Sequence, residues 1–209
     1  MSRRQYLNVK RFFYTDRILI SVTGGIVCTV QGSYEYRHYM QDGYDDKGWG
    51  CAYRSLQTIW SWLLINGYVT QPVPSHKDIQ QMLADCGDKD QKFVGTKQWI
   101  GSFELSCCLN HALNVSSILA LSNGAELDSK ARQLILHFEN GGSPVMIGGG
   151  AYAYTILGVH FDEVTGDARF LVLDPHYTGP EDIKTIIDKG WCGWKRSSFC
   201  HLFLMVLLL

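Results

Sequence analysis

The sequence lacks an excess of charge of either sign. Its 209 residues include 19 lysines and arginines and 20 aspartates and glutamates, so the formal net charge is −1 at pH 7. Proteins that bind nucleic acids or other polyanions usually present a strongly basic face. The composition therefore gives no reason to expect a nucleic-acid partner.

Metal-binding cysteine pairs and phosphate-binding motifs are missing as well. Seven cysteines occur, and none forms a Cys-x-x-Cys pair of the kind that binds zinc. Gly148-Gly149-Gly150 is not followed by Lys-Ser or Lys-Thr, so a nucleotide-binding loop is not predicted. These glycines better fit the close approach of a substrate backbone or a neighbouring strand. We expect neither a metal nor another cofactor.

Long apolar runs are also absent. The apolar segment at the C-terminus, residues 199–209, has eleven residues, whereas a membrane-spanning helix needs about 20. We predict no membrane span and interpret this segment as a terminal strand, or else as a replaced end that packs poorly. No secretory signal opens the chain. A reducing, cytoplasmic compartment is therefore expected, with most thiols serving as small buried apolar groups.

The sequence does contain enough apolar residues for one folded domain, with 46% hydrophobic and 19% charged residues. Helical periodicity comes first along the chain, and strand-like runs with a hairpin signal at 162–167 follow, which is typical of an α+β domain. A capping box of Ser75 and Asp78 marks one helix start. The predicted helices cover 51–64, 75–86, 102–112, 127–139 and 181–189, and the predicted strands cover 18–30 (one bent strand or a pair), 144–147, 154–161 and 168–173.

Cys51 follows Gly48-Trp49-Gly50 and begins the first predicted helix. Unpaired N–H groups and the partial positive charge at a helix N-terminus favour a thiolate, which is the nucleophilic form of cysteine. The same N–H groups can stabilise the oxyanion of a tetrahedral intermediate. A buried structural thiol is the alternative for Cys51, and it is the favoured interpretation for Cys107 and Cys108 in the middle of a predicted helix.

Asp174-Pro175-His176 follows the predicted strand 168–173. Residues two apart on extended backbone face the same side, so Asp174 can orient the imidazole while His176 removes the proton from the thiol. A simple Asp-Pro turn is the alternative. His160 is a second candidate base, but the predicted hairpin places it at the opposite end from Asp174.

An oxyanion hole needs a second donor besides the amide of Cys51. Tyr39 is a candidate through its phenol, although spacing alone makes a core tyrosine more common. Trp191-Cys192-Gly193-Trp194 pairs two aromatic residues with small spacers. These tryptophans fit either the wall of a narrow cleft or the core.

Six blocks of the sequence stand out together: YMQD at 39–42, DKGWGCAYRSLQT at 46–58, QWIG at 98–101, PVMIGGG at 144–150, DPHYTG at 174–179 and KGWCGW at 189–194. They closely resemble the ubiquitin-fold-modifier-specific cysteine proteases, in particular the catalytic domain of the larger, second type. A weaker likeness, confined to Gly-Trp-Gly-Cys and Asp-Pro-His, connects the chain with autophagy cysteine proteases.

The resemblance implies a papain-like fold, in which helices pack on a mostly antiparallel sheet. It assigns Cys51 as the nucleophile, His176 as the base, Asp174 as its orienting partner and Tyr39 as the oxyanion donor. It implies cleavage after the C-terminal glycine of the modifier, both in the precursor and on target lysines. A cleft walled by tryptophans would admit only a residue without a side chain, such as glycine. The candidates for residues that line this substrate cleft are Trp49, Gly149, Trp191 and Trp194.

The resemblance also suggests a division of the chain. Residues 1–31 form a short N-terminal extension, residues 32–195 the papain-like catalytic domain, and residues 196–209 a divergent apolar tail. The larger family type carries a long N-terminal domain and is connected with an adaptor at the endoplasmic reticulum, which raises that adaptor as a partner and the cytosolic face of that membrane as a location. Two alternatives to a protease are an inactive modifier-binding module with an altered C-terminus and a thiol acyltransferase.

Overall fold

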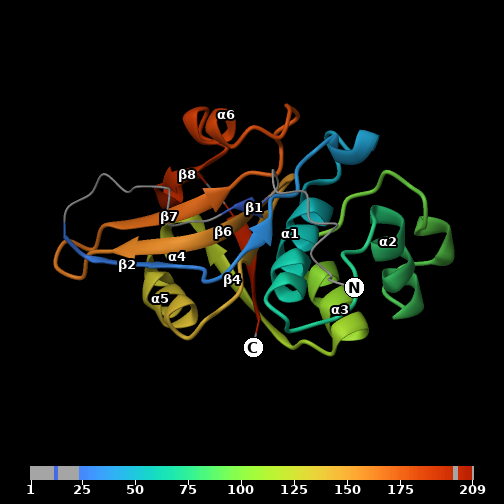
Figure 1. Ribbon diagram of the computed structural model, residues 1–209. Coiled ribbons are helices and arrows are strands. Elements are labelled where there is room, and N and C mark those ends of the chain that lie inside the picture. Colours follow the sequence, from blue (N-terminus) through green and yellow to red (C-terminus); the bar gives the residue numbers. More distant parts are fainter. Residues whose placement is uncertain (1–11, 14–23, 200–201, 209) are drawn as a thin grey trace.

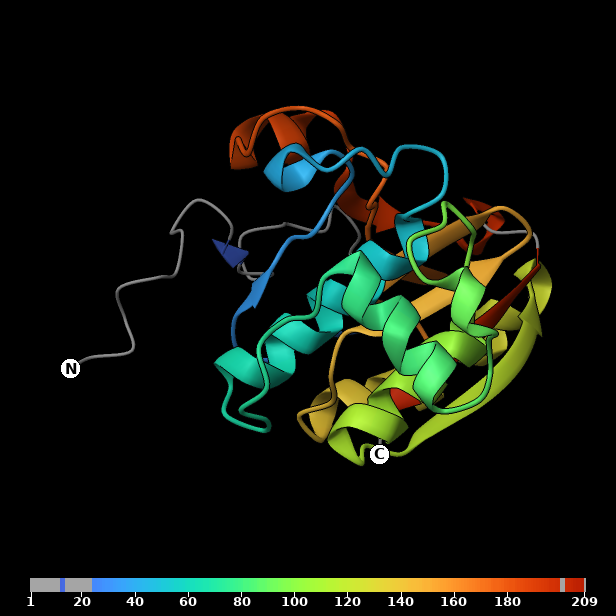
Figure 2. The same ribbon diagram turned by 90° about the vertical axis from the view of Figure 1, so that its right-hand side faces the viewer.

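The computed structural model describes residues 12–13, 24–199 and 202–208. Two helices, α1 (Cys51–Ile65) and α3 (Ser102–Leu113), pack on the main sheet, and α2 (His76–Asp85) packs on α3 farther from the sheet (Figure 1). Seen from the side in Figure 2, these three helices lie in front of the sheet. This arrangement confirms the predicted α+β class with helices packed on an antiparallel sheet.

The main sheet has seven strands in the order β4-β9-β5-β6-β7-β8, and β2 pairs with the far end of β6. All of its pairings are antiparallel. A separate small sheet pairs β1 (Phe12–Phe13) with β3 (Tyr34–Glu35). The strands of the main sheet are β2 (Ile26–Thr29), β4 (Ser117–Asn123), β5 (Val145–Gly149), β6 (Tyr152–Phe161), β7 (Ala168–Leu173), β8 (Cys192–Lys195) and β9 (Leu202–Leu208).

Most predicted elements are confirmed. Ser75 caps α2 and forms a capping box with Asp78, and the hairpin of β6 and β7 pairs Phe161 with Ala168. The C-terminal segment forms a strand, β9, which lies between β4 and β5. Of the predicted strand 18–30, the structure shows β2, and residues 18–23 lie outside the described residues. Outside residues 124–139, the remaining described helical elements are α6 (Ile183–Asp188), η4 (Gln41–Gly43), η5 (Gln91–Phe93) and η6 (Ser197–Phe199).

The single helix predicted over 127–139 is wrong. The structure has two helices there, α4 (Gly124–Ser129) and α5 (Ala131–Glu139). The break falls at Lys130, whose N–H donates to the carbonyl oxygen of Leu127 three residues back. That short bond tightens the backbone and closes α4, because the α-helical pattern requires a partner four residues back. Sequence periodicity also missed β4 and β8.

The helix α1 is buried along almost its whole length. Leu56 and Ile59 are fully buried, and Trp60 and Leu63 are nearly so. The helix packs against β3, β5, β6 and α3. A helix that is surrounded by apolar contacts is fixed in position by its packing. The residue at its N-terminus is consequently placed firmly beside the sheet.

Two strands of the main sheet, β2 and β9, lie outside the predicted catalytic domain of residues 32–195. The predicted domain bounds nevertheless stay a prediction, because sheet membership does not define a domain that folds independently. None of the helices in the described ranges is both long and apolar enough to cross a membrane.

Replacing Ser75 with alanine is expected to lower the free energy of unfolding by about 1 kcal/mol, because the N–H of Asp78 loses its capping acceptor. Denaturant unfolding followed by circular dichroism measures this change. Lys77→Ala in the same turn is the control and is expected to change the value by no more than about 0.5 kcal/mol. Equal effects of the two substitutions would contradict the capping role.

Candidate active site

Cys51 is the first residue of α1 and is 7% exposed. A tight turn directly precedes Cys51. In this turn the N–H groups of Trp49 and Gly50 donate to the main-chain oxygen of Asp46 at 3.2 and 2.9 Å. Gly48 has a φ of 87°, a conformation that suits glycine. A Cβ at Gly50 would lie 2.5 Å from Oδ2 of Asp46. Glycine at positions 48 and 50 therefore suits the turn that places the thiol at the helix N-terminus.

Asp174 and His176 lie directly beyond β7 and contact each other. The Nδ1 of His176 donates to Oδ1 of Asp174 at 2.6 Å, and the main-chain N–H of His176 donates to the same oxygen at 3.0 Å. The loop is anchored by the Asp174 N–H, which donates to the Trp191 carbonyl at 2.8 Å. The carboxylate thus selects the tautomer that leaves Nε2 free to meet the thiol.

The ring of His176 is hydrogen-bonded to the side chain of Cys51 as well. Burial on its own lowers the pKa of His176, but the hydrogen bonds to Asp174 and Cys51 and the charges of both partners outweigh it and raise the pKa to about 9. An imidazole with this pKa is protonated at neutral pH. The arrangement can therefore hold an imidazolium beside the sulfur, which is the state that stabilises a thiolate.

Tyr39 contacts both His176 and Cys51. Its ring centroid is 5.2 Å from that of His176, in an edge-to-face orientation. Its phenol is hydrogen-bonded to the side chain of Cys51, and the main-chain N–H of Cys51 donates to the phenol oxygen. Burial and the charge of the Cys51 sulfur raise the pKa of Tyr39, so the phenol keeps its proton. The Tyr39 O–H and the Cys51 N–H, two groups that can donate to an oxyanion, therefore lie next to each other beside the sulfur.

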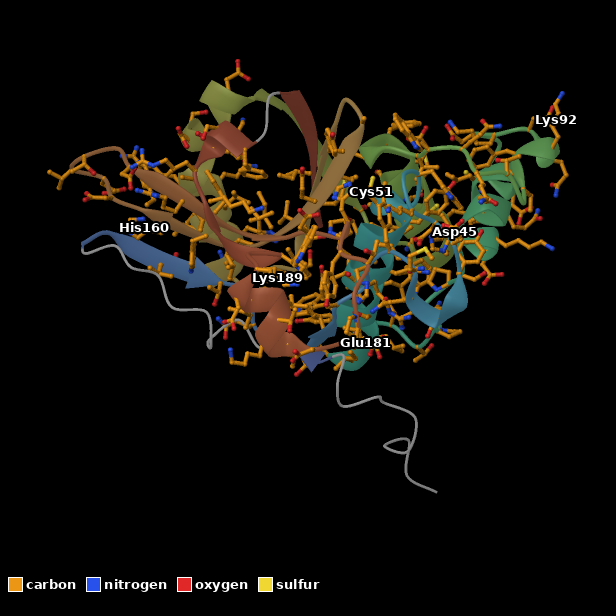
Figure 3. All side chains as sticks on the ribbon, turned by 90° about the horizontal axis from the view of Figure 1, so that it is seen from above. Asp45, Cys51, Lys92, His160, Glu181 and Lys189 are labelled. Carbon is orange, nitrogen blue, oxygen red and sulfur yellow. The ribbon has the colours of Figure 1, made fainter. Side chains whose placement is uncertain are left out.

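The alternative base, His160, is remote from these groups. It lies on β6 opposite Arg169, whereas Thr155 at the other end of the strand pairs with Leu173 next to Asp174. Figure 3 labels His160 and Cys51 and shows them well separated. The Nε2 of His160 lies 2.9 Å from the carbonyl oxygen of Gly24. Its role is structural.

A cavity of about 290 Å³ opens beside Cys51. Gly149 lines it, as do Trp99 and Tyr152, whose side chains are 55% and 60% exposed. The N–H of the Trp99 indole donates to the Gly48 carbonyl at 2.9 Å, directly beside the nucleophile turn. The other lining residues are Ile100, Gly101, Glu104, Met146, Gly148, Gly150, Ala151 and Ala153.

The three tryptophans assigned to the cleft do not line this cavity. Trp49 is 6% exposed and packs its ring against Tyr53 and His76. Trp191 packs on Tyr177, and Trp194 lies on β8 opposite Leu171. The walls expected from these residues are formed instead by Trp99 and Tyr152. A contact of Trp49, Trp191 or Trp194 with substrate outside the cavity stays a prediction.

Trp99 and Tyr152 were missed as site residues because neither stands next to a nucleophile or base in the sequence. Trp99 lies within the block QWIG that carries the resemblance, which was the available signal. None of the other described cysteines lines the cavity. Cys108 is fully buried in α3, and burial raises its pKa, which agrees with the structural role predicted for it.

Comparison with known proteins places these residues in a family context. The model of peptidase family C78 matches residues 25–205. A Ufm1-specific protease of Caenorhabditis elegans is 59% identical over 187 residues, which are 88% of this chain and 32% of that protein. Ufm1-specific protease 2 of Homo sapiens is 56% identical over 176 residues, 84% of this chain and 38% of that protein.

A solved structure is similar too. The crystal structure of UfSP from C. elegans matches with a TM-score of 0.79 and 54% sequence identity, covering 88% of this chain and 34% of that one. The chain spans about a third of the length of these curated relatives. The papain-like α+β fold predicted from the resemblance is confirmed by this match.

The titration of His176 tests the geometry of the site. We expect the imidazolium of His176 to lose its proton with a midpoint near pH 9. NMR spectra of the ring recorded as a function of pH measure this midpoint. Asp174→Asn and Cys51→Ala should each lower the midpoint, because each removes a partner of the imidazolium, and Cys86→Ser should leave it unchanged.

The same pKa shift predicts how the contribution of His176 to the stability of the fold changes with pH. The folded-state pKa of His176 lies above the ordinary value of 6.5, so its contribution to stability is fully present below pH 6.5 and is lost as the pH rises through 9. The destabilisation caused by His176→Asn should therefore shrink between pH 6 and pH 9.5. A wild-type midpoint near 6.5, or a destabilisation that grows with pH, would contradict the ion pair.

Proposed function

This chain belongs to peptidase family C78, and from that premise we propose that it is a cysteine protease that cleaves after the C-terminal glycine of a ubiquitin-fold modifier. Its substrates are the precursor of the modifier and the conjugates in which the modifier is joined to lysine side chains. Cys51, His176, Asp174 and Tyr39 carry the reaction. The observation that supports this most directly is the contact of His176 with both Asp174 and Cys51.

The first half of the reaction forms a thioester. The Cys51 thiolate attacks the carbonyl carbon of the terminal glycine, and the carbonyl oxygen takes the negative charge. The Cys51 N–H and the Tyr39 O–H donate to that oxyanion. As the tetrahedral intermediate collapses, the carbon–nitrogen bond breaks and the His176 imidazolium donates its proton to the leaving amine.

The second half releases the modifier. Neutral His176 removes a proton from a water molecule, and the resulting hydroxide attacks the thioester carbon. The carbon–sulfur bond then breaks, which leaves Cys51 as the thiolate beside the imidazolium and the modifier with a terminal carboxylic acid. This acid loses its remaining proton to solvent and becomes a carboxylate. Asp174 keeps its hydrogen bond to Nδ1 in both halves, so the same ring nitrogen receives and donates every proton.

Selectivity for glycine follows from the walls of the cavity. Gly101, Gly148, Gly149 and Gly150 expose backbone along it, and Trp99 and Tyr152 narrow it. A Cβ on Gly148 would lie 3.2 Å from Oγ of Ser102, which shows how closely β5 approaches α3 at this point. An extended C-terminal end of the substrate without side chains fits this narrow cavity. A residue with a branched side chain beside the scissile bond would instead clash with the residues that line the cavity.

The alternative of an inactive binding module rested on the unusual C-terminal segment. That segment forms η6 and β9, and β9 lies between β4 and β5 within the main sheet. The segment therefore takes part in the sheet that carries β5 to the cavity, which supports the active protease over the inactive module. The adaptor at the endoplasmic reticulum stays a prediction from the resemblance, and the cytoplasmic location stays a prediction from the sequence.

Cys51→Ser is expected to reduce cleavage of a modifier–lysine conjugate to background, because a hydroxyl is not ionised by a neighbouring imidazolium as a thiol is. The measurement is conjugate disappearance and free modifier on a gel, with circular dichroism to confirm an unchanged fold. Cys86→Ser is the matched control, since Cys86 is an exposed thiol outside the cavity. Undiminished turnover by Cys51→Ser would rule out the proposed mechanism.

Tyr39→Phe is expected to lower kcat by about 10²–10³, because one oxyanion donor is lost, and to change KM little. Steady-state kinetics on a fluorogenic conjugate of the modifier measures both constants. Tyr68→Phe is the control, because Tyr68 is 63% exposed and stacks on Trp62. A rise in KM with unchanged kcat would show that Tyr39 binds substrate instead of stabilising the transition state.

A further inference from the structure

Asp46 has the most completely enclosed carboxylate near the site. Its side chain has no solvent exposure. The Met40 N–H donates to Oδ1 at 2.8 Å, while Nε of Arg54 and Nε2 of His76 donate to Oδ2 at 2.6 and 3.0 Å. Burial alone raises the pKa of Asp46, but hydrogen bonds from His76 and Arg54 and the charge of Arg54 outweigh it and lower the pKa. The group is a buried carboxylate anion.

The three donors come from three separate parts of the chain. Arg54 lies one turn into α1, His76 is the first residue of α2, and Met40 directly follows Tyr39. Asp46 also begins the turn to Cys51, because its main-chain oxygen accepts from Trp49 and Gly50. One residue therefore connects the loop of the oxyanion donor with the turn and helix of the nucleophile.

Met40 needs this support because of its backbone. Its φ is 62° and its ψ is 7°, in the left-handed region, where the Cβ of a non-glycine residue crowds the following carbonyl. Its side chain is 41% exposed, so core packing does not account for this conformation. The contact that accompanies this conformation is the bond from the Met40 N–H to Asp46 at 2.8 Å, and a sparsely populated backbone conformation persists only where its surroundings hold it.

We propose that Asp46 is a positioning residue that holds the phenol of Tyr39 over Cys51 by binding the N–H of the left-handed Met40. This inference rests on the proposed function, and it adds a residue that does not itself touch the substrate. A purely structural ion pair between Asp46 and Arg54 is the competing explanation. The two explanations differ in their effect on Tyr39, because only the positioning role requires Asp46 to act on catalysis through the Tyr39 phenol.

Asp46→Asn separates the two explanations. Arg54 has only donors, so it takes the single amide oxygen, and the new NH₂ group faces the Met40 N–H, which loses its acceptor. We expect kcat for a modifier conjugate to fall by about tenfold or more, with KM little changed. Alkylation of Cys51 by iodoacetamide needs no oxyanion hole and should keep its rate. Asp45→Asn is the matched control, because Asp45 is the exposed neighbour labelled in Figure 3.

A double-mutant cycle with Tyr39→Phe gives the decisive readout. If Asp46 acts through the phenol, Asp46→Asn lowers kcat in the wild type but not in the Tyr39→Phe background. Multiplicative losses in the double variant would overturn the inference. In addition, Met40→Gly should recover part of the lost kcat in the Asp46→Asn background, because glycine adopts a positive φ without crowding. No recovery would also count against it.

A second variant tests the inference if Asp46→Asn does not fold well enough. If Asp46→Asn lowers the melting temperature enough to reduce the folded fraction, Asp46→Asn/Arg54→Met removes the unpaired buried charge, and the same cycle is measured in that background. The outcomes are distinguishable from a failure of the proposed function. If the wild type does not cleave the conjugate, the proposed function fails, whereas cleavage by the wild type and by Asp46→Asn at equal kcat overturns only the role of Asp46.

Discussion

The hydrogen bond between Asp174 Oδ1 and His176 Nδ1, 2.6 Å long, determines what the rest of the site can do. It leaves the other ring nitrogen to face Cys51, and it contributes to a His176 pKa of about 9. The sulfur meets that ring because α1 packs against β5 and β6 of the sheet, with Cys51 at its first turn. A carboxylate on the sheet side and a thiol on the helix side are thus joined across the two layers by one imidazole.

Several main-chain contacts keep the loops of these residues together. The Tyr39 N–H donates to the Pro175 carbonyl at 2.9 Å, and the Tyr36 hydroxyl donates to the Asp174 carbonyl. Nδ1 of His38 lies 2.9 Å from the Tyr39 oxygen and 3.1 Å from the Tyr177 oxygen, so it links both loops. The oxyanion donor and the base are therefore positioned as one unit, which limits the reorganisation needed during reaction. Asp46 extends that unit to the nucleophile turn.

Local signals in the sequence predicted the elements that depend on local physics. Helical periodicity found α1, the capping box found α2, and the turn at 162–167 found the hairpin of β6 and β7. The strands β4 and β8 were missed because β4 pairs with β9 from the far end of the chain and β8 is four residues long. The chemistry of Cys51, Asp174 and His176 was predicted from two short segments. Spacing alone favoured a core position for Tyr39, and the tyrosine is indeed 4% exposed while its phenol contacts the sulfur.

The central claim is that a thiolate at position 51 bonds to the acyl carbon of a terminal glycine. The most direct measurement uses the modifier with its last glycine replaced by a propargyl amine group, followed by intact mass determination and peptide mapping of the labelled protein. The account predicts one adduct per chain, located on Cys51, whose formation is lost in His176→Asn. Absence of an adduct on the wild-type protein, or an adduct on a different cysteine such as Cys86, would contradict it.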